Sequence, residues 1–392
     1  MFSMVCRGAF DARPEELLMS IVDELSGPPS LILCSGSIAT NLDVLRNGVH
    51  SDVPFHGSSS CLGVMTTEGA FVEGGVGVGI LGISDPAGAY GTAVVSMDEE
   101  SVEDAVRRAL HKALAQAGRP GETPELIWLS STPGMEERVI ASIHETIGTG
   151  VPICGGSAAD NSVSGDWVVF DRSERFGSGI AITVMFPSVA VGYAFHSGYR
   201  PTTTKGQVTS TDGRSIMAID GQPGAEVYNR WTEGKIDDAM ETGGSVIAST
   251  SLSPLGRRRN AVAGFDYFLL SHPESVSENG GLALFSDIQE GDEIVLMEGS
   301  EDNLVHRAPR VAENALEMAR LDKEHISGAL VIYCAGCMLT VQDRMTEVAT
   351  GLRDVLGGKP FLGTFTFGEQ GCFIGGSNHH GNLMISVVVF GV

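Results

Sequence analysis

Residues 327–392 show a clear succession of apolar and polar positions. A short apolar run at 329–333 predicts a buried strand. Apolar residues at three- and four-residue steps then predict one face of a helix that begins at Thr340: Val341, Met345, Val348, Leu352 and Val355. Thr340 and Asp343 have the spacing of a capping box at its start. Strands at 361–365 and 383–390 complete this unit.

The same order of strand, helix and strand recurs twice nearer the N-terminus. Apolar runs at 31–34 and 126–129 predict strands, and a helical pattern follows each of them. Every unit then reaches a segment of the form x-Pro-(Phe/Ile)-x-Gly-small, found at 53–58, 151–156 and 359–364. A degenerate fourth copy at 253–256 would give a period of roughly 100 residues, which is too long for a solenoid repeat.

We therefore expect an α/β protein with mixed β-sheets flanked by helices, in two halves built from a duplicated module of roughly 100 residues. Residues 200–310 predict an antiparallel patch that joins the halves. In each repeat, proline opens a strand without loss of a ladder hydrogen bond, and glycine allows a sharp turn. Ligands of open α/β folds bind at such strand ends, so these turns predict a glycine-lined rim that holds a small-molecule ligand.

Composition and charge narrow the functional class. The chain has 392 residues, of which 42% are hydrophobic, and a formal charge of −24. Nucleic acids and anionic membranes need basic patches, so we expect neither as a partner. The basic run 257–259 is expected in a solvated loop. Residues 1–10 lack a signal-peptide pattern, no apolar stretch reaches the ~18 residues of a membrane span, and the seven cysteines indicate reduced thiols. These features predict a cytoplasmic protein.

Cys334-x-x-Cys337 is the sharpest candidate for chemistry. It lies at the end of a predicted strand and ahead of a helix, where amide dipoles can lower the pKa of a thiol. Two structural thiols in a turn are an equally natural interpretation. A tetrahedral zinc site would lack ligands, because the sequence has no second C-x-x-C and no H-x-x-x-H.

His56 and Cys154 occupy equivalent positions in the repeated segment, with Leu362 at the third. They could be ligands of haem iron, contacts for a small molecule, or packed structural residues. His379 and His380 are adjacent on a predicted strand, where neighbouring side chains point to opposite faces, so joint metal ligation is not expected.

Asp160 and Glu369 are carboxylates that follow glycine turns in related units. Each could bind the amine of a ligand or accept hydrogen bonds from loop amides. The pattern Gly77-x-Gly79-x-x-Gly82 spells a dinucleotide-binding fingerprint, but it lies inside an apolar run without a following helix. We interpret these glycines as structural.

The segments CGGSAADN at 154–161 and GTFTFGEQG at 363–371 resemble the FIST family of two-part sensory proteins. IDGQPGAEVY at 219–228 and SDIQEGD at 286–292 fit the same family. The likeness covers nearly the whole chain and implies a FIST-N half at 1–222 and a FIST-C half at 223–392. It also implies an intracellular sensor of a small ligand. Amino acids have been suggested as ligands of the family, and some bacterial members bind haem and respond to nitric oxide.

The resemblance also assigns individual residues. The family's glycine pair, acidic residue, cysteine of the C-terminal half and Gly-Glu pair match this chain at the following positions: Gly155, Gly156, Asp160, Cys334, Gly368 and Glu369. Cys337 stands where the family often has arginine, and the usual Asn-x-Thr near the end is poorly kept around Asn382. These departures imply a ligand that differs from those of the relatives.

We therefore expect a sensory protein that binds an amino-acid-like metabolite and signals to a separate protein partner. The expected ligand contacts are His56, Ser58, Cys154, Gly155, Gly156, Asp160, Asn161, Cys334, Cys337, Thr364 and Glu369. No catalytic residue, metal or cofactor is expected in this interpretation. Two alternatives stay open: a haem-binding nitric-oxide sensor, and a thiol-dependent enzyme that uses Cys334 and Cys337.

Overall fold

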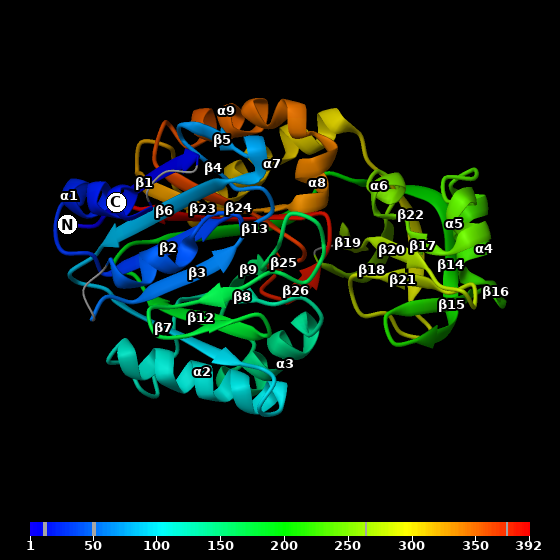
Figure 1. Cartoon of the computed structure of the whole chain (residues 1–392), viewed down its shortest axis with the longest axis horizontal. Coiled ribbons are helices and arrows are strands. Elements are labelled where there is room, and N and C mark those ends of the chain that lie inside the picture. The colour runs from blue at the N-terminus through cyan, green and yellow to red at the C-terminus, as the bar shows by residue number, and fades with distance from the viewer. Residues whose placement is uncertain (11–13, 49–51, 263–264, 374) are drawn as a thin grey trace.

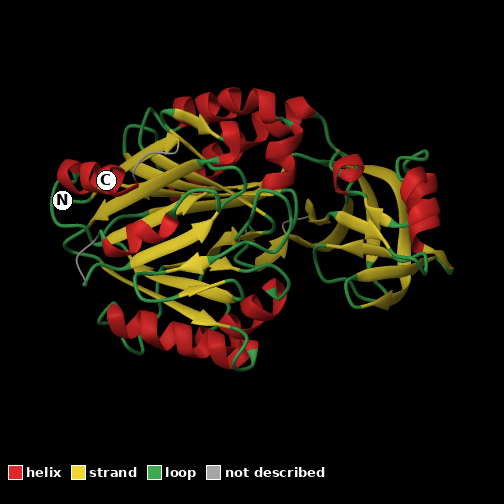
Figure 2. Ribbon diagram, viewed as in Figure 1, coloured by secondary structure: helices red, strands yellow, loops and turns green. Residues whose placement is uncertain are grey.

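The computed structural model has a mixed α/β fold in which helices lie outside the strands (Figures 1 and 2). It describes residues 1–10, 14–48, 52–262, 265–373 and 375–392. These residues form three six-stranded sheets, which pack together, and a nine-stranded sheet that lies to one side of them in Figure 1. In the described part of the chain, no helix is both long and apolar enough to span a membrane.

The three six-stranded sheets share one internal strand order. We call the corresponding segments unit 1 (3–84), unit 2 (89–186) and unit 3 (191–197 with 301–391). Unit 1 contains β1 (Ser3–Phe10), α1 (Pro14–Glu24), β2 (Leu31–Gly36), η1 (Leu42–Asn47), β3 (Phe55–Ser59) and β6 (Gly77–Ser84). Unit 2 contains β7 (Ala89–Ser96), α2 (Val102–Gln116), β8 (Leu126–Ser131), α3 (Glu136–Ile147), β9 (Ile153–Ser157) and β12 (Gly179–Phe186). Unit 3 contains β13 (Val191–Ser197), α7 (Glu301–Ala319), β23 (Ile326–Cys334), α8 (Ala335–Thr340), η3 (Gln342–Arg344), α9 (Met345–Val355), β24 (Phe361–Thr366) and β27 (Met384–Gly391).

The repeated proline segments occupy the same place in the three units. Each proline immediately precedes the second strand of a parallel pair: β2 with β3, β8 with β9, and β23 with β24. The carbonyls of Pro54, Pro152 and Pro360 each accept a 3.0 Å hydrogen bond from the preceding strand. The predicted strand openings are therefore confirmed. Pro254 of the degenerate fourth copy precedes β18 (Leu255–Val262), which pairs antiparallel in the nine-stranded sheet and belongs to no such unit.

Each unit sends a short hairpin into the sheet of another unit. The hairpin of β4 (Val64–Thr66) and β5 (Gly69–Phe71), followed by η2 (Glu73–Gly75), extends unit 3 through β24. The hairpin of β10 (Val169–Phe170) and β11 (Arg175–Phe176) extends unit 1 through β3. The hairpin of β25 (Glu369–Cys372) and β26 (Asn378–Gly381) extends unit 2 through β9. This cyclic exchange ties the three units together.

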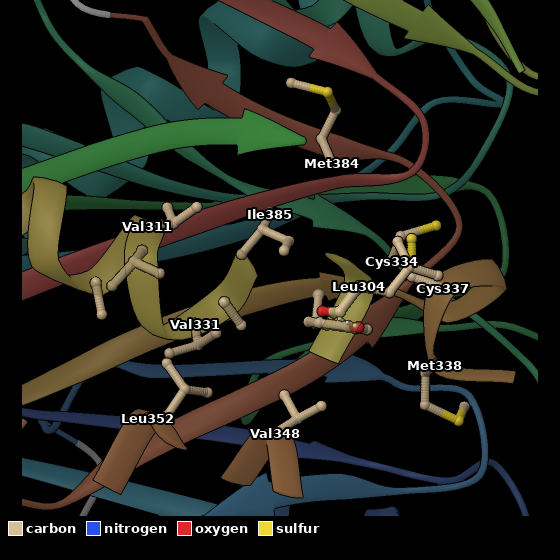
Figure 3. Close-up of a cluster of buried hydrophobic side chains, with 14 of the residues drawn as sticks. Leu304, Val311, Val331, Cys334, Cys337, Met338, Val348, Leu352, Met384 and Ile385 are labelled. Carbon is tan, nitrogen blue, oxygen red and sulfur yellow. Dashed lines mark hydrogen bonds between the residues drawn. The ribbon is translucent and has the colours of Figure 1, made fainter. Parts of the chain in front are cut away.

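One buried core joins all three units. Its side chains come from the inner faces of the three sheets and include Leu33, Trp128 and Leu362. The outer faces are covered by helices: α1 and η1 on unit 1, α2 and α3 on unit 2, and α7 and α9 on unit 3. Figure 3 shows part of the unit 3 layer, where Val311, Val331 and Leu352 meet.

Residues 200–298 form an inserted domain between β13 and α7, with its own core. It contains β14 (Arg200–Asp212), β15 (Ser215–Ile219), β16 (Gln222–Pro223), α4 (Gly224–Trp231), α5 (Asp237–Thr242), β17 (Gly244–Ser245), α6 (Ile247–Thr250), β18, β19 (Phe265–Ser271), β20 (Pro273–Val276), β21 (Leu282–Leu284) and β22 (Glu293–Glu298). All its strand pairs are antiparallel, as expected from the sequence.

Two local expectations are wrong. The helix after β23 begins at Ala335, and Thr340 ends it; the Thr340 hydroxyl donates to the Gly336 carbonyl at 2.8 Å instead of capping a helix start. The arginine run lies in strand β18 instead of a solvated loop, and Arg257 is only 4% exposed. The Gly77–Gly82 pattern lies within strand β6, as expected.

Candidate functional site

Some of the predicted contacts meet at the shared core. His56, Ser58 and Thr364 line a closed interior of about 10 Å³ together with Ser130. A single water needs a volume of roughly 10–15 Å³, so this interior does not accommodate an amino acid. Two of the three repeated segments, 53–58 and 359–364, thus meet at this interior, and side chains fill almost all of it.

His56 bridges units 1 and 2. Its Nδ1 lies 2.9 Å from the Thr183 hydroxyl and its Nε2 lies 2.9 Å from the Ser130 hydroxyl. Burial lowers the pKa of His56 to about 3, so the ring is neutral at pH 7. Because both ring nitrogens have partners and the surrounding volume is so small, His56 does not fit a haem ligand.

The His56 pKa predicts a measurable pH dependence. In the unfolded state His56 has a pKa near 6.5 and is therefore protonated between pH 6 and 4, whereas in the native state it stays neutral. The unfolded state thus binds one more proton, so the free energy of unfolding falls as the pH falls. We expect the free energy of unfolding of the wild type to drop by about 1.4 kcal/mol per pH unit more than that of His56→Gln in this range. Urea unfolding at several pH values measures both slopes; equal slopes would contradict the assignment.

Cys154, Gly155 and Gly156 lie on β9, which pairs with β8 on one side and β25 on the other. Cys154 is fully buried, and burial raises its pKa to about 12, which disfavours the thiolate. A Cβ at Gly155 would lie 1.8 Å from the Leu129 carbonyl oxygen, and a Cβ at Gly156 would lie 2.4 Å from Thr366 Cγ2. The glycines thus permit close approach of neighbouring strands.

Asp160 and Asn161 hold loops in place. The Asp160 carboxylate accepts hydrogen bonds from the backbone amides of residues 162–166, and these amides lower its pKa against the opposing effect of burial. Asn161 Oδ1 accepts from the Leu62 amide at 2.7 Å, and its Nδ2 donates to the Gly75 carbonyl at 3.1 Å. Asn161 therefore fastens unit 2 to unit 1.

Cys334 and Cys337 lie close together at the end of β23 and the start of α8 in unit 3 (Figure 3), and Glu369 is buried beside Cys334. Thr366, a partner of Glu369, also lines the interior around His56. Burial, and then the neighbouring Cys337, raises the pKa of Cys334 well above its usual range. Burial also raises the pKa of Glu369, whose carboxyl accepts from the Thr366 hydroxyl at 2.9 Å and the Met384 amide at 3.0 Å. A reactive thiol requires the opposite environment, electropositive and partly exposed. This geometry favours structural thiols over a thiol enzyme.

A larger pocket of about 430 Å³ lies between unit 2 and the inserted domain. We call it the junction pocket. Its walls come from α3, β18, β19 and the β25–β26 hairpin, and its lining includes Glu137, Ile140, Ala141, His144, Arg257, Arg259, Leu269, Asn378, His379 and His380. It therefore combines an apolar wall with basic side chains, in a chain that is strongly acidic overall.

Arg257 is the unusual residue of the junction pocket. Its Nη1 donates to the Asp287 carbonyl, but Nε and Nη2 are buried and have no hydrogen-bond partner among the described residues. The neighbouring Arg259 also has a buried Nε without a partner in this part of the chain. Burial and then the charge of Arg259 lower the pKa of Arg257 to about 10. Two adjacent cations with unsatisfied donors in a cavity form a site suited to an anion.

An ion-pair cluster lies beside the junction pocket and shares Glu137 with its lining. Arg214, from the turn between β14 and β15, places Nη2 2.8 Å from Glu136 Oε2 and 2.7 Å from Glu137 Oε2, and Nε 2.8 Å from Asp287 Oδ1. The ligand atoms of Glu136, Glu137 and His380 lie within 4.8 Å of one another, which is a cation-site geometry. The Arg214 guanidinium already neutralises these carboxylates, so the cluster serves as a link between the domains.

The junction pocket also does not fit haem. His144 and His379 line it, but the apolar lining is limited to Ile140, Ala141 and Leu269, which do not form the two facing apolar surfaces that enclose a macrocycle. None of the residues expected as ligand contacts lines this pocket. The arginine run 257–259 is the sequence feature that could have indicated this pocket. Alternate residues of a strand share one face, so Arg257 and Arg259 point the same way.

Comparison with known proteins places the chain in a family. The FIST N domain matches residues 30–222, and the FIST C domain matches residues 224–372. No curated protein matches the sequence. Among solved structures, the chain is similar to the cyanuric acid hydrolase from A. caulinodans, with 10% sequence identity, a TM-score of 0.41 and 100% of each chain covered. The two domain matches together span most of the sequence, and the chain belongs to the FIST domain family.

Proposed function

We propose that this protein is an intracellular sensor that binds a small amino-acid-like anion in the junction pocket and signals to a separate protein partner. The observation that carries the proposal is the buried Arg257, whose Nε and Nη2 face no acceptor among the residues described. These two nitrogens are buried in this structure, and we propose that the guanidinium turns them toward a ligand carboxylate in the bidentate geometry that guanidinium groups favour.

The rest of the junction pocket suits an amino-acid-like molecule. Ile140 and Leu269 provide an apolar surface for a side chain, beside the Glu137 carboxylate that already pairs with Arg214 at 2.7 Å. The volume of about 430 Å³ lies in the range of small-ligand pockets, roughly 300–1,000 Å³. The walls belong to unit 2 and the inserted domain, so a ligand that contacts both would favour one arrangement of the two over others.

A thermal-shift screen with the full chain tests the proposal. The probes are the common L-amino acids and their carboxamides, which lack the carboxylate but keep the side chain. We expect at least one acid to raise the free energy of unfolding by about 2.7 kcal/mol at a hundredfold excess over its Kd, and its amide to have no effect. A screen in which no acid stabilises the protein, or in which acid and amide act equally, would overturn the proposal.

Arg257→Met is the matched change in the protein. We expect it to abolish stabilisation by the acid and to leave the ligand-free protein as stable as the wild type or more so, because a buried and incompletely paired charge is removed. Arg258→Met is the control, since Arg258 is exposed and pairs with Asp266 at 2.8 Å. Calorimetric titration of the three proteins gives the affinities, and retained binding in Arg257→Met would contradict the assigned contact.

A further inference from the structure

A second hollow lies beside the inserted domain, separate from the junction pocket. It consists of two continuous parts of about 310 and 430 Å³, which share Ser197, Tyr199 and Arg307 in their lining. We call it the α7 groove. Neighbouring residues of β19 line the two sites, because Phe268 faces the groove and Leu269 faces the junction pocket.

One end of the α7 groove is basic. Arg200, His306, Arg307 and Arg310 line it, in a chain with 49 acidic and 25 basic residues. Arg307 and Arg310 form no ion pair with any described residue, and Arg307 Nε is buried without a hydrogen-bond partner there. Nearby on unit 3, by contrast, Arg344 pairs with Asp302 at 2.7 Å and Glu347 at 2.9 Å. The two groove arginines are thus a local excess of positive charge.

The other end of the α7 groove is apolar and aromatic. Its lining includes Tyr267, Phe268, Met297, Phe373 and Met384. The carboxylate that also lines this end, Asp266, is already paired with Arg258 at 2.8 Å. The Phe373 ring lies 5.3 Å from that of Tyr267 and 5.6 Å from that of His379, which itself lines the junction pocket. An aromatic site beside unpaired arginines suits a segment that carries both an apolar side chain and carboxylates.

We propose that the α7 groove docks an acidic segment of a partner protein, with one apolar side chain at the aromatic end and carboxylates over Arg307 and Arg310. The acidic character of the remaining surface would repel such a segment elsewhere, which directs it to this groove. A free inorganic anion would satisfy the arginines but would leave the aromatic end unused. The inference adds a docking surface to the proposed sensor and stands on residues other than those of the junction pocket.

Fluorescence polarisation tests the groove with a labelled peptide, Glu-Glu-Phe-Glu-Glu-Phe-Glu-Glu. We expect the full chain to bind it, and the double variant Arg307→Glu, Arg310→Glu to weaken binding by at least about tenfold. The control is Arg107→Glu, Arg353→Glu, which changes the net charge equally at arginines whose side chains are 50% and 46% exposed. It should bind within about twofold of the wild type. Melting curves confirm that each variant is folded.

Further comparisons make the result specific. Replacing both phenylalanines of the peptide by alanine should weaken binding several-fold, and Arg257→Met should leave it unchanged, which separates this surface from the ligand pocket. Absence of peptide binding by the wild type, or equal binding by the two double variants, would overturn the proposal. Equal binding of the phenylalanine and alanine peptides with complete displacement by millimolar inorganic phosphate would also overturn it, because it would indicate a simple anion site.

Discussion

Replacing Gly155 by alanine is expected to prevent folding or to reduce the free energy of unfolding by at least about 3 kcal/mol. Gly155 has φ 153°, which an L side chain rarely adopts, and a Cβ would lie 1.8 Å from the Leu129 carbonyl oxygen. That oxygen belongs to the backbone of β8, opposite Gly155 in the parallel pair, so it cannot move away without disrupting the sheet. The clash therefore falls on the strand pair at the centre of unit 2.

Gly165→Ala is the matched control, because it separates backbone strain from steric overlap. Gly165 has φ 94°, but a Cβ there would meet nothing within 4 Å. We expect Gly165→Ala to cost about 1–2 kcal/mol from its backbone conformation alone. Urea unfolding monitored by circular dichroism measures both variants. If the two cost the same, the close approach of β8 and β9 does not determine the need for glycine at position 155.

The strands that hold these glycines could be predicted from the sequence because their signals are local. Proline at the start of a strand and glycine three residues later, as in Pro152 and Gly155, reflect constraints on the backbone that act within a few residues. The three copies also placed His56 and Cys154 at equivalent positions, and the structure buries both side chains. Local patterns, however, do not reveal whether side chains from three sheets leave a hollow where they meet.

Other features could not be predicted because they depend on contacts between distant residues. The helix that begins at Ala335 contains Gly336 and Cys337 in its first turn, which carry no strong helix signal, whereas Thr340 and Asp343 imitate a capping box. Similarly, α7 begins at Glu301 and continues through Pro309, a residue that usually indicates a helix end. In both helices, tertiary packing overrides the local preference.

The location of the junction pocket could not be predicted from local sequence patterns either. Glu137, Arg257 and His379 come from three elements that are more than one hundred residues apart in sequence. The pairing of the β25–β26 hairpin with β9 brings His379 to unit 2, and the inserted domain contributes Arg257. The basic run was expected in a solvated loop, whereas it lies in strand β18, where Arg257 is buried and Arg258 is exposed. The sequence resemblance identified the family, whereas the junction pocket, where we propose that a ligand binds, could be located only in the assembled structure.

The second large effect is expected from Arg214→Met. This change keeps much of the side-chain volume but removes the charge that faces Glu136, whose side chain is 2% exposed. Loss of one partner of a buried ion pair costs about 3–5 kcal/mol, and we expect a loss of unfolding free energy near the lower end because the Ser157 hydroxyl still donates to Glu136 at 2.9 Å. The exposed control Arg200→Met, which removes a pair with Glu298, should cost less than about 1 kcal/mol.

The pH dependence of Arg214→Met distinguishes a lost charge pair from lost packing. In the wild type, burial raises the pKa of Glu136, but His380 and Arg214 outweigh it and hold that pKa below its usual range. The carboxylate therefore adds stability above the unfolded pKa, and this contribution is lost as the pH falls. Without Arg214, burial raises the pKa of Glu136 with less opposition, so the charged carboxylate becomes less favourable in the native state. The loss of unfolding free energy in the variant should therefore be largest at pH 7 and should shrink toward pH 4.5.

Adding Glu136→Gln should recover part of the loss at pH 7, because the unpaired charge is then removed. A deficit that is independent of pH and unaffected by Glu136→Gln would show that Arg214 links the inserted domain to α3 through packing instead of charge.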